Sequence, residues 1–259
     1  MSVEAEMNDF TKIFIKINKF GYYLGLPPMW KETALAEQLL PLQHFLRIGL
    51  NLITVVFILM EWFSYYTQVN LSKKQHKDQL IFAISHPLLL LNVINVEMYS
   101  SKIEELLNEM IISLKLIYND KELEREAIRK SKIFSAVFCA IMVFAFLSYC
   151  IDATQVVIGG GTFTTIITSW PDVHDYSLMA NIARVLTNLV WFHFLVRISG
   201  IYILVNSATI SVSQQFTNLQ SYFYSLHAIF EEHIPQNEKE EKYEQALILG
   251  IQMHVRTLW

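Results

Sequence analysis

Two charged side chains lie inside apolar runs and could form an ion pair there. Arg197 lies about 22 Å into a helix that starts at Ile182, at 1.5 Å per residue. An arginine at that depth in a membrane is costly and usually faces a polar interior or a partner. Glu97, at the end of another apolar run, is the partner we expect. The alternative is that Arg197 extends its guanidinium to the lipid headgroups without a partner.

Three apolar runs share aromatic and hydroxyl side chains in one half of their length. Such a lining suits a small lipophilic ligand, held mainly by burial of apolar surface at about 25 cal/mol per Å². Ordinary helix packing is the alternative for any single residue. The candidate ligand-binding residues are Phe82, Ser85, His86, Phe146, Tyr149, Cys150, Thr154, Met179, Ile182 and Leu186.

No motif predicts catalysis, a metal site or a cofactor. Gly159–Gly161 lacks the strand and the GK[ST] sequence of a phosphate-binding loop. Asp172, His174 and Asp175 are better explained as a solvated loop than as metal ligands. The net charge of −4 argues against nucleic acid as a partner. We therefore expect a protein that is not an enzyme and has no cofactor.

The composition points to a membrane. The chain is 53% hydrophobic and only 17% charged, with a mean hydropathy of +0.32. A helix needs about 20 mostly apolar residues to cross a bilayer. Four runs meet this requirement, at residues 42–66, 79–98, 133–158 and 182–212. The predicted fold class is an all-α polytopic membrane protein.

The distribution of lysine and arginine predicts the orientation of these four spans. Residues 1–41, 99–132 and 213–259 hold most of the positive charges, so the positive-inside rule places them in the cytoplasm, together with the N-terminus. Residues 67–78 and 159–181 are then extracellular loops. The N-glycosylation sequon at Asn70 falls in the first of these loops.

Amphipathic helices are expected outside the membrane as well. Phe10 and Phe14 belong to an apolar stripe with lysines between its members, which predicts a short helix on the inner leaflet. Similar stripes recur at residues 103–117, 219–230 and 243–258. The last stripe runs to Trp259 without a cap, so we expect the sequence to be truncated, with four spans of seven present.

The pattern as a whole resembles the insect odorant receptor family. The resemblance is carried by the N-terminal segment ending KFGYYLGLPPMW, by four spans with a long cytoplasmic segment between the second and third, and by LQSYFYSLHAIFEE and LILGIQMHVRTLW after the fourth. The last segment places His254 in an Ile-x-x-His setting, which is similar to the cytoplasmic helices of the family.

The resemblance implies a function and partners. It implies a plasma-membrane subunit with seven spans that senses a small hydrophobic or volatile ligand. Such a subunit forms a hetero-oligomer, a tetramer, with a co-receptor, and the complex is an odorant-gated cation channel in olfactory neurons. The family's pockets lie in the outer parts of several spans, which overlaps the candidates above. Its pore-lining span is the last one, beyond Trp259.

Two alternatives remain open from the sequence. A gustatory receptor has the same topology, and its distinguishing signature lies in the last span. A fragment of a membrane transporter would show an inverted repeat with broken helices. His86–Pro87 offers one such break, and no second matching site is evident.

Overall fold

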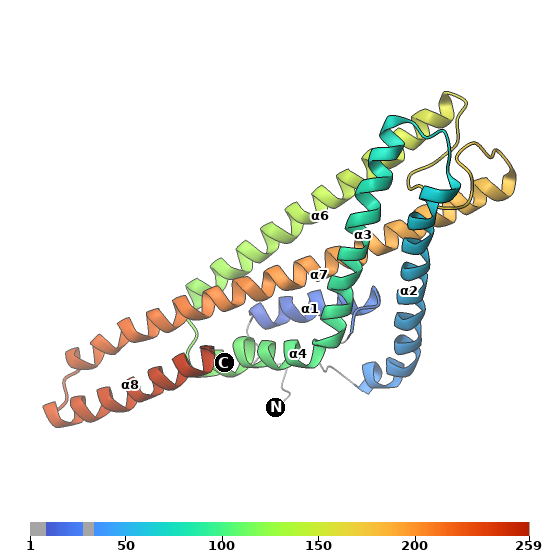
Figure 1. Cartoon of the computed structure of the whole chain (residues 1–259). Helices are drawn as coiled ribbons and strands as arrows, with labels where there is room; N and C mark the ends of the chain where they lie inside the picture. Colours follow the sequence, from blue (N-terminus) through green and yellow to red (C-terminus); the bar gives the residue numbers. More distant parts are fainter. Residues whose placement is uncertain (1–8, 28–33, 259) are drawn as a thin grey trace. The chain divides into compact units, whose positions relative to one another are not determined.

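The computed structural model describes residues 9–27 and 34–258, and within them the chain forms eight α-helices and no strand (Figure 1). A π-helical segment, η2, and a 3₁₀ segment, η3, interrupt the series. The elements in order are α1 (Asp9–Tyr23), α2 (Ala34–Thr67), α3 (Lys73–Met98), α4 (Ser100–Asn108), η2 (Glu109–Ser113), α5 (Leu114–Ile117), α6 (Lys121–Ile158), α7 (Leu178–Ser225), η3 (Leu226–Glu231) and α8 (Gln236–Leu258).

Within the described residues, four helical stretches are long and apolar enough to cross a membrane. They are Leu42–Thr67 within α2, all of α3, all of α6, and Leu178–Glu231, which joins α7 and η3. Each contains one of the four apolar runs of the sequence. The predicted all-α fold with membrane-spanning helices is therefore confirmed.

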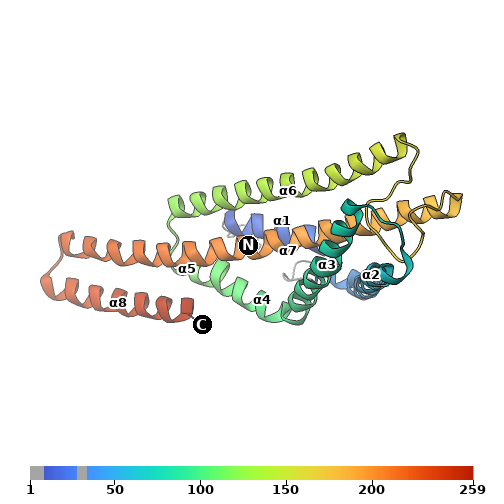
Figure 2. The same ribbon diagram turned by 45° about the horizontal axis from the view of Figure 1, so that its top comes forward.

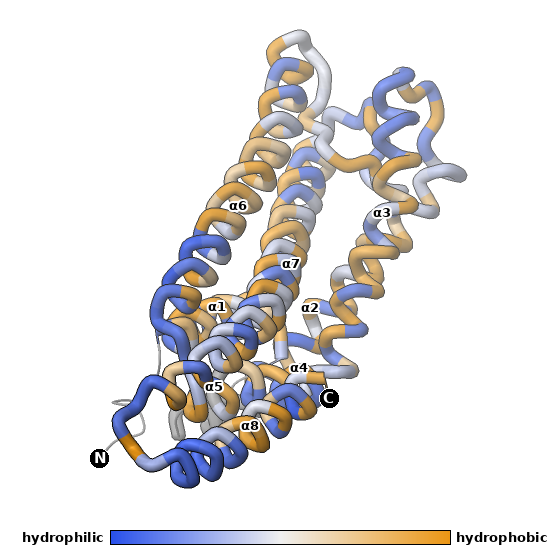
Figure 3. Tube along the Cα trace, turned by 90° about the vertical axis from the view of Figure 1, so that its left-hand side faces the viewer, coloured by the Kyte–Doolittle hydropathy of each residue, from blue (hydrophilic) through white to orange (hydrophobic). Residues whose placement is uncertain are grey.

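Capping residues lie at the starts of α3 and α6, before the apolar run of each helix. Helix α3 begins at Lys73 after a capping box. The Ser72 hydroxyl accepts from the Gln75 backbone N–H at 3.2 Å, and the Gln75 side-chain oxygen accepts from the Ser72 backbone N–H at 2.8 Å. Before α6, the Asp120 carboxylate accepts from the Glu122 N–H at 2.9 Å. The first turns of α6 are hydrophilic, and its later turns are hydrophobic (Figure 3).

The chain divides into two compact units. The first unit comprises the described residues up to Asn18, Ser101–Ser135 and those from Ile203 onward. The second unit comprises the described part of Lys19–Ser100 together with Ala136–Tyr202. Because α6 and α7 are long, each contributes one part to each unit. The core of the second unit includes Phe57, Phe82 and Trp191.

Proline does not break α3, contrary to the break considered at His86–Pro87. A proline in a helix leaves the carbonyl four residues earlier without its donor, here that of Ala83. The indole Nε1 of Trp62 in α2 donates to this carbonyl at 2.8 Å. A neighbouring helix thus satisfies the freed carbonyl, which is how membrane helices tolerate proline.

Helix α1 uses its apolar face against the rest of the protein. Phe10 and Phe14 are almost completely buried, and the Phe10 N–H donates to the Glu124 carboxylate at 3.1 Å. The expected contact of this face with lipid is not observed for these two residues, because protein covers both. Helix α1 ends at Tyr23, before Gly25, whose φ of +83° suits glycine. The sequence expectations that involve Pro28, Trp30, Lys31 and Trp259 lie outside the described residues.

In the first unit, α7 and α8 lie side by side as a hairpin closed by η3 (Figures 1 and 2). The Tyr222 hydroxyl donates to the Ala246 carbonyl at 2.8 Å. Gly250 allows the close approach, since a Cβ at that position would lie 2.6 Å from the Phe223 ring. The helix predicted at residues 243–258 is therefore present, and it begins earlier, at Gln236.

Candidate functional site

An aromatic cluster forms the core of the second unit. We use this name for Phe82, Phe146, Tyr149 and Trp191. The Phe82 ring lies 5.4 Å from Tyr149 and 5.8 Å from Trp191, measured between ring centroids. Phe146 lies 5.6 Å from Trp191. Helices α3, α6 and α7 each contribute to the cluster, so it joins three of the four long apolar helices.

His86 lies beside the aromatic cluster and pairs with an acid that the sequence reasoning missed. Its Nδ1 is 2.7 Å and 2.9 Å from the two carboxylate oxygens of Glu61 in α2. Both side chains are almost completely buried. The His86 ring stacks on Phe82 at 4.9 Å. This pair fixes α2 against α3, because a buried carboxylate needs a hydrogen-bonding partner in an apolar setting.

A cavity of about 410 Å³ lies next to the aromatic cluster, and we call it the polar cavity. It is lined by the start of α3, the end of α6 and the loop between α6 and α7. Tyr149 belongs to both the cluster and the cavity. Pockets that hold small organic ligands usually measure about 300–1,000 Å³, so the volume is suitable for one.

Charged side chains of α3 and α6 meet in the polar cavity. The Lys74 ammonium forms an ion pair with the Asp152 carboxylate and lies 6.0 Å from the centroid of the Tyr149 ring. Asp78 lines the same cavity, and its carboxyl is within hydrogen-bonding reach of the Tyr149 hydroxyl. About half of the Lys74 and Asp152 side-chain surfaces remains exposed.

Gln68 is one of the residues that anchor the loop lining the polar cavity. Gln68, just after α2, donates through Nε2 to the carbonyls of Thr168 and Pro171 at 2.8 Å and 3.0 Å. Its Oε1 accepts from the Val173 N–H at 3.1 Å. Gln68 is buried, so these bonds are shielded from water. The cavity wall therefore has a defined structure even though it is a loop.

The acidic residues of this loop accept backbone hydrogen bonds that close local turns. Asp172 accepts from the His174 N–H at 2.8 Å, and Asp175 accepts from the Ser177 N–H at 2.8 Å. The bond from Ser177 holds the pKa of Asp175 below its usual range. Arg184 donates to the carbonyls of Asp172 and Asp175. Among the residues that the structure describes, no cluster of histidine, cysteine and acidic side chains is arranged to hold a metal.

The structure brings together some of the predicted ligand-binding residues and separates others. Phe82, Phe146 and Tyr149 meet around Trp191, and His86 stacks on Phe82. Of the predicted set, only Tyr149 also lines the polar cavity. The remaining members lie at the margin or point outward: Ser85 and Cys150 are half-buried, whereas Thr154, Met179, Ile182 and Leu186 are exposed.

The sequence did not identify several residues of this site, among them Trp191, Glu61, Asp78 and Asp152. Glu61 could have been found, because an acid within an apolar run is a functional candidate by default. Asp152 could have been found in the same way, because it lies within the predicted run 133–158, whereas Asp78 gave no signal, since it lies just before the run 79–98. Trp191 shares a helix face with the buried Phe194 and Ile198, but α7 is apolar on most of its surface, so this spacing did not single out Trp191.

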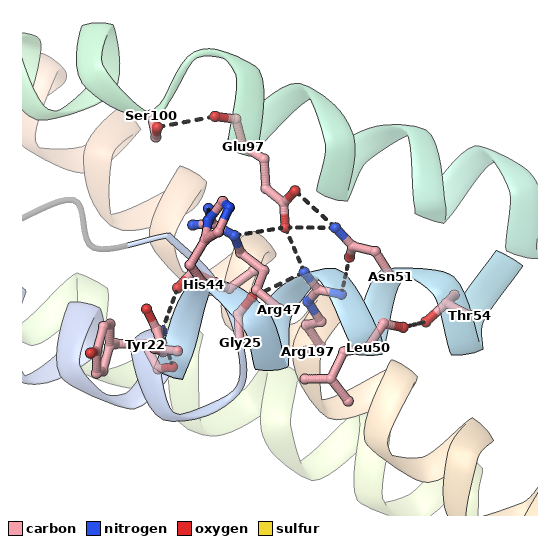
Figure 4. A network of polar contacts seen from close by, with 12 residues as sticks. Tyr22, Gly25, His44, Arg47, Leu50, Asn51, Thr54, Glu97, Ser100 and Arg197 are labelled. Carbon is pink, nitrogen blue, oxygen red and sulfur yellow. Dashed lines mark hydrogen bonds and ion pairs between the residues drawn. The ribbon is translucent and has the colours of Figure 1, made fainter. Parts of the chain in front are cut away.

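Arg197 and Glu97 form an ion pair within a larger polar network of the second unit (Figure 4). Arg197 Nη2 is 2.7 Å from Glu97 Oε1 and also donates to the Gly25 carbonyl at 3.0 Å. Its Nη1 donates to Asn51 Oδ1 at 2.6 Å, and Asn51 in turn donates to both Glu97 oxygens. Arg47 Nε lies 3.9 Å from Glu97. We call these five residues the Arg197 network.

The Arg197 network joins four segments of the second unit. It connects α2, α3, α7 and the chain after α1 through hydrogen bonds to one guanidinium. The Arg197 side chain is only 1% exposed. Its guanidinium is therefore enclosed by protein rather than extended toward headgroups, unlike the alternative considered from the sequence. The network holds these segments together, and most of its polar groups are already hydrogen-bonded to one another.

Comparison with known proteins adds no relative: no protein-family model and no curated protein matches this chain.

Proposed function

We propose that this chain is the ligand-sensing subunit of an odorant-receptor-type cation channel in the plasma membrane, with its N-terminus in the cytoplasm. The observation that carries the proposal is the polar cavity of about 410 Å³, bordered by an aromatic residue of the core. The resemblance of the sequence to the insect odorant receptor family supports the channel function and the co-receptor as partner.

The position of the polar cavity supports a sensing role. A ligand there contacts α3, α6 and the loop that precedes α7 at the same time. Tyr149 then connects the ligand to Phe82 and Trp191, whose rings lie 5.4 Å from it in both cases. A ligand shifts a conformational equilibrium by its differential affinity for the two states. Contacts with three segments give it the means to favour one arrangement of them.

A transporter fragment is less well supported than a receptor. The broken helices that such a protein needs at its substrate site are not found at His86–Pro87, where α3 is continuous. The charged pair in the interior is held in a closed network by Asn51 and the Gly25 carbonyl. These groups are already engaged and offer no open ion site.

Direct binding tests the sensing role. The chain is reconstituted in lipid nanodiscs and titrated with a panel of volatile alcohols, esters, aldehydes and amines while intrinsic tryptophan fluorescence is measured. We expect at least one compound to bind and Tyr149→Ala to weaken it about tenfold or more, because the variant removes the aromatic wall of the cavity. Leu147→Ala, on the exposed side of the same helix, is the matched control.

Two further results complete that test. In cells that also express an insect odorant co-receptor, the chain should co-purify with that co-receptor, because the resemblance implies a hetero-oligomer of the two. A panel with no binding member, or binding that Tyr149→Ala and Leu147→Ala weaken equally, contradicts the proposed sensing site.

A further inference from the structure

We infer that the polar cavity selects small organic amines in their protonated form, and this inference rests on the proposed function of the cavity as a ligand site. The chemistry is that of an alkylammonium group held by carboxylates and an aromatic face, with an apolar body in the remaining space. The residues that would hold such a ligand all lie within the second unit: Lys74, Asp78, Tyr149, Asp152 and Thr165.

The chain itself places an ammonium group in the cavity. The Lys74 Nζ pairs with the Asp152 carboxylate and lies 6.0 Å from the Tyr149 ring centroid. A cation within about 6 Å of an aromatic face is attracted by the ring quadrupole. The lysine thus occupies the kind of environment that recognises a ligand amine. Because about half of its side chain is exposed, a ligand ammonium can take this place when Lys74 swings into solvent.

The charges that line the cavity favour a cation over an anion. Asp78 and Asp152 contribute two negative charges, and Lys74 contributes one positive charge. His174, also in the lining, is the remaining titratable group besides the tyrosines. Counting only the formal charges of these two carboxylates and one ammonium, the net charge of the lining is −1. An added ammonium neutralises this charge, whereas an added carboxylate increases the repulsion.

A threonine hydroxyl gives the cavity a further polar contact. Thr165 lines the cavity and is only 8% exposed, and no side chain or backbone group of the described residues donates to its hydroxyl oxygen. A ligand N–H donor can satisfy this oxygen. Val156, Ile167 and Val173 supply apolar surface for the body of the ligand.

A matched set of three probes tests the inference. The compounds 2-phenylethylamine, 2-phenylethanol and phenylacetate share one ring and spacer and differ in the polar group. We expect the nanodisc-reconstituted chain to bind the amine about tenfold more tightly than the alcohol, because charge-assisted hydrogen bonds are stronger than neutral ones. Phenylacetate should bind most weakly.

Variants of the lining charges sharpen the test. Asp152→Asn and Asp78→Asn should each weaken the amine about tenfold while leaving the alcohol within about twofold. Lys74→Met should tighten the amine several-fold, since it removes the competing ammonium. Lys73→Met, next to Lys74 and outside the lining, is the control and should change neither affinity.

The outcomes separate this inference from the proposed function. If phenylacetate binds best and Lys74→Met abolishes its binding, the cavity is an anion site and the inference is overturned. If the amine and the alcohol bind equally, and both depend on Tyr149, the cavity is a ligand site without amine selectivity. Failure of every compound in both panels overturns the proposed function as well.

Discussion

The polar cavity and the Arg197 network both hold charged side chains within the second unit, yet they differ in how far these charges are enclosed. Arg197 is 1% exposed and is bonded to three groups. Lys74 in the cavity is 54% exposed and has one ion-pair partner. The same chemical type, a cation beside a carboxylate, is a fixed structural element in one place and an exchangeable contact in the other.

Enclosed charges stabilise the fold, whereas exposed charges remain available to a ligand. Breaking a buried ion pair is strongly destabilising, because the remaining charge is left without compensation. Breaking an exposed pair costs little, because water replaces the lost partner. Breaking the Arg197–Glu97 pair should therefore lower stability strongly. Breaking the Lys74–Asp152 pair should change ligand binding and leave stability nearly unchanged.

The largest expected effect is that of Arg197→Met. The variant leaves Glu97 with the Asn51 amide and the more distant Arg47, and it removes the bond to the Gly25 carbonyl. We expect a loss of about 3–5 kcal/mol in the free energy of unfolding. Lys74→Met in the polar cavity should cost about 0–1 kcal/mol. Chemical unfolding of both variants in the same detergent measures the two losses in free energy. Equal losses would contradict the expected difference between the enclosed and the exposed pair.

A charge exchange tests the pairing itself. Arg197→Glu combined with Glu97→Arg restores opposite charges across the same two helices. Recovery should be partial, since Asn51 and the Gly25 carbonyl are placed for a guanidinium on α7. Surface expression of the double variant should exceed that of either single variant. Expression no better than that of the single variants would mean that the pair does not stabilise the fold.

Lys115 of the first unit should have a smaller effect on stability than Arg197. Unlike Arg197, it is a buried cation without a hydrogen-bond acceptor among the described residues. Its Nζ lies 4.4 Å from the Phe10 ring centroid. Burial lowers the pKa of Lys115 from 10.5 to about 8, while Glu124 raises it and Lys121 lowers it further. The unfolded chain therefore binds more protons between these two pKa values, and stability rises with pH across that interval.

We expect Lys115→Met to flatten this rise, which amounts to at most about 3 kcal/mol. The variant should also be more stable than the parent at pH 7, where the parent retains the full cost of a buried charge. Thermal unfolding of both proteins at pH 7 and pH 9.5 measures the difference. An unchanged pH dependence in the variant would show that Lys115 is solvated in the folded state.

The sequence predicts the long helices and the Arg197–Glu97 pair for the same physical reason. A run of about 20 apolar residues is long enough to identify a span, and a charged residue within such a run is easily identified as well. Trp62 and Ala83 show the limit of this reasoning. The repair of the carbonyl freed by Pro87 depends on the rotation of α2 against α3, which local sequence does not encode.

The candidate site was only partly predictable for a related reason. Helix α7 is apolar on most of its surface, so spacing alone did not show that Trp191 faces inward while Met179 and Leu186 face outward. The polar cavity depends on Gln68 holding a loop about 100 positions further along the chain. A contact of that kind requires the folded backbone.

The most direct test of a ligand site that opens to the outside is the sidedness of the cavity. Single cysteines at Lys73, beside the cavity, and at Glu240, near the start of α8, are made in a Cys139→Ala, Cys150→Ala background. The account predicts that a membrane-impermeant maleimide labels Lys73→Cys on intact cells and Glu240→Cys only after permeabilisation. Labelling in the reverse order would contradict it, because the polar cavity would then face the cytoplasm.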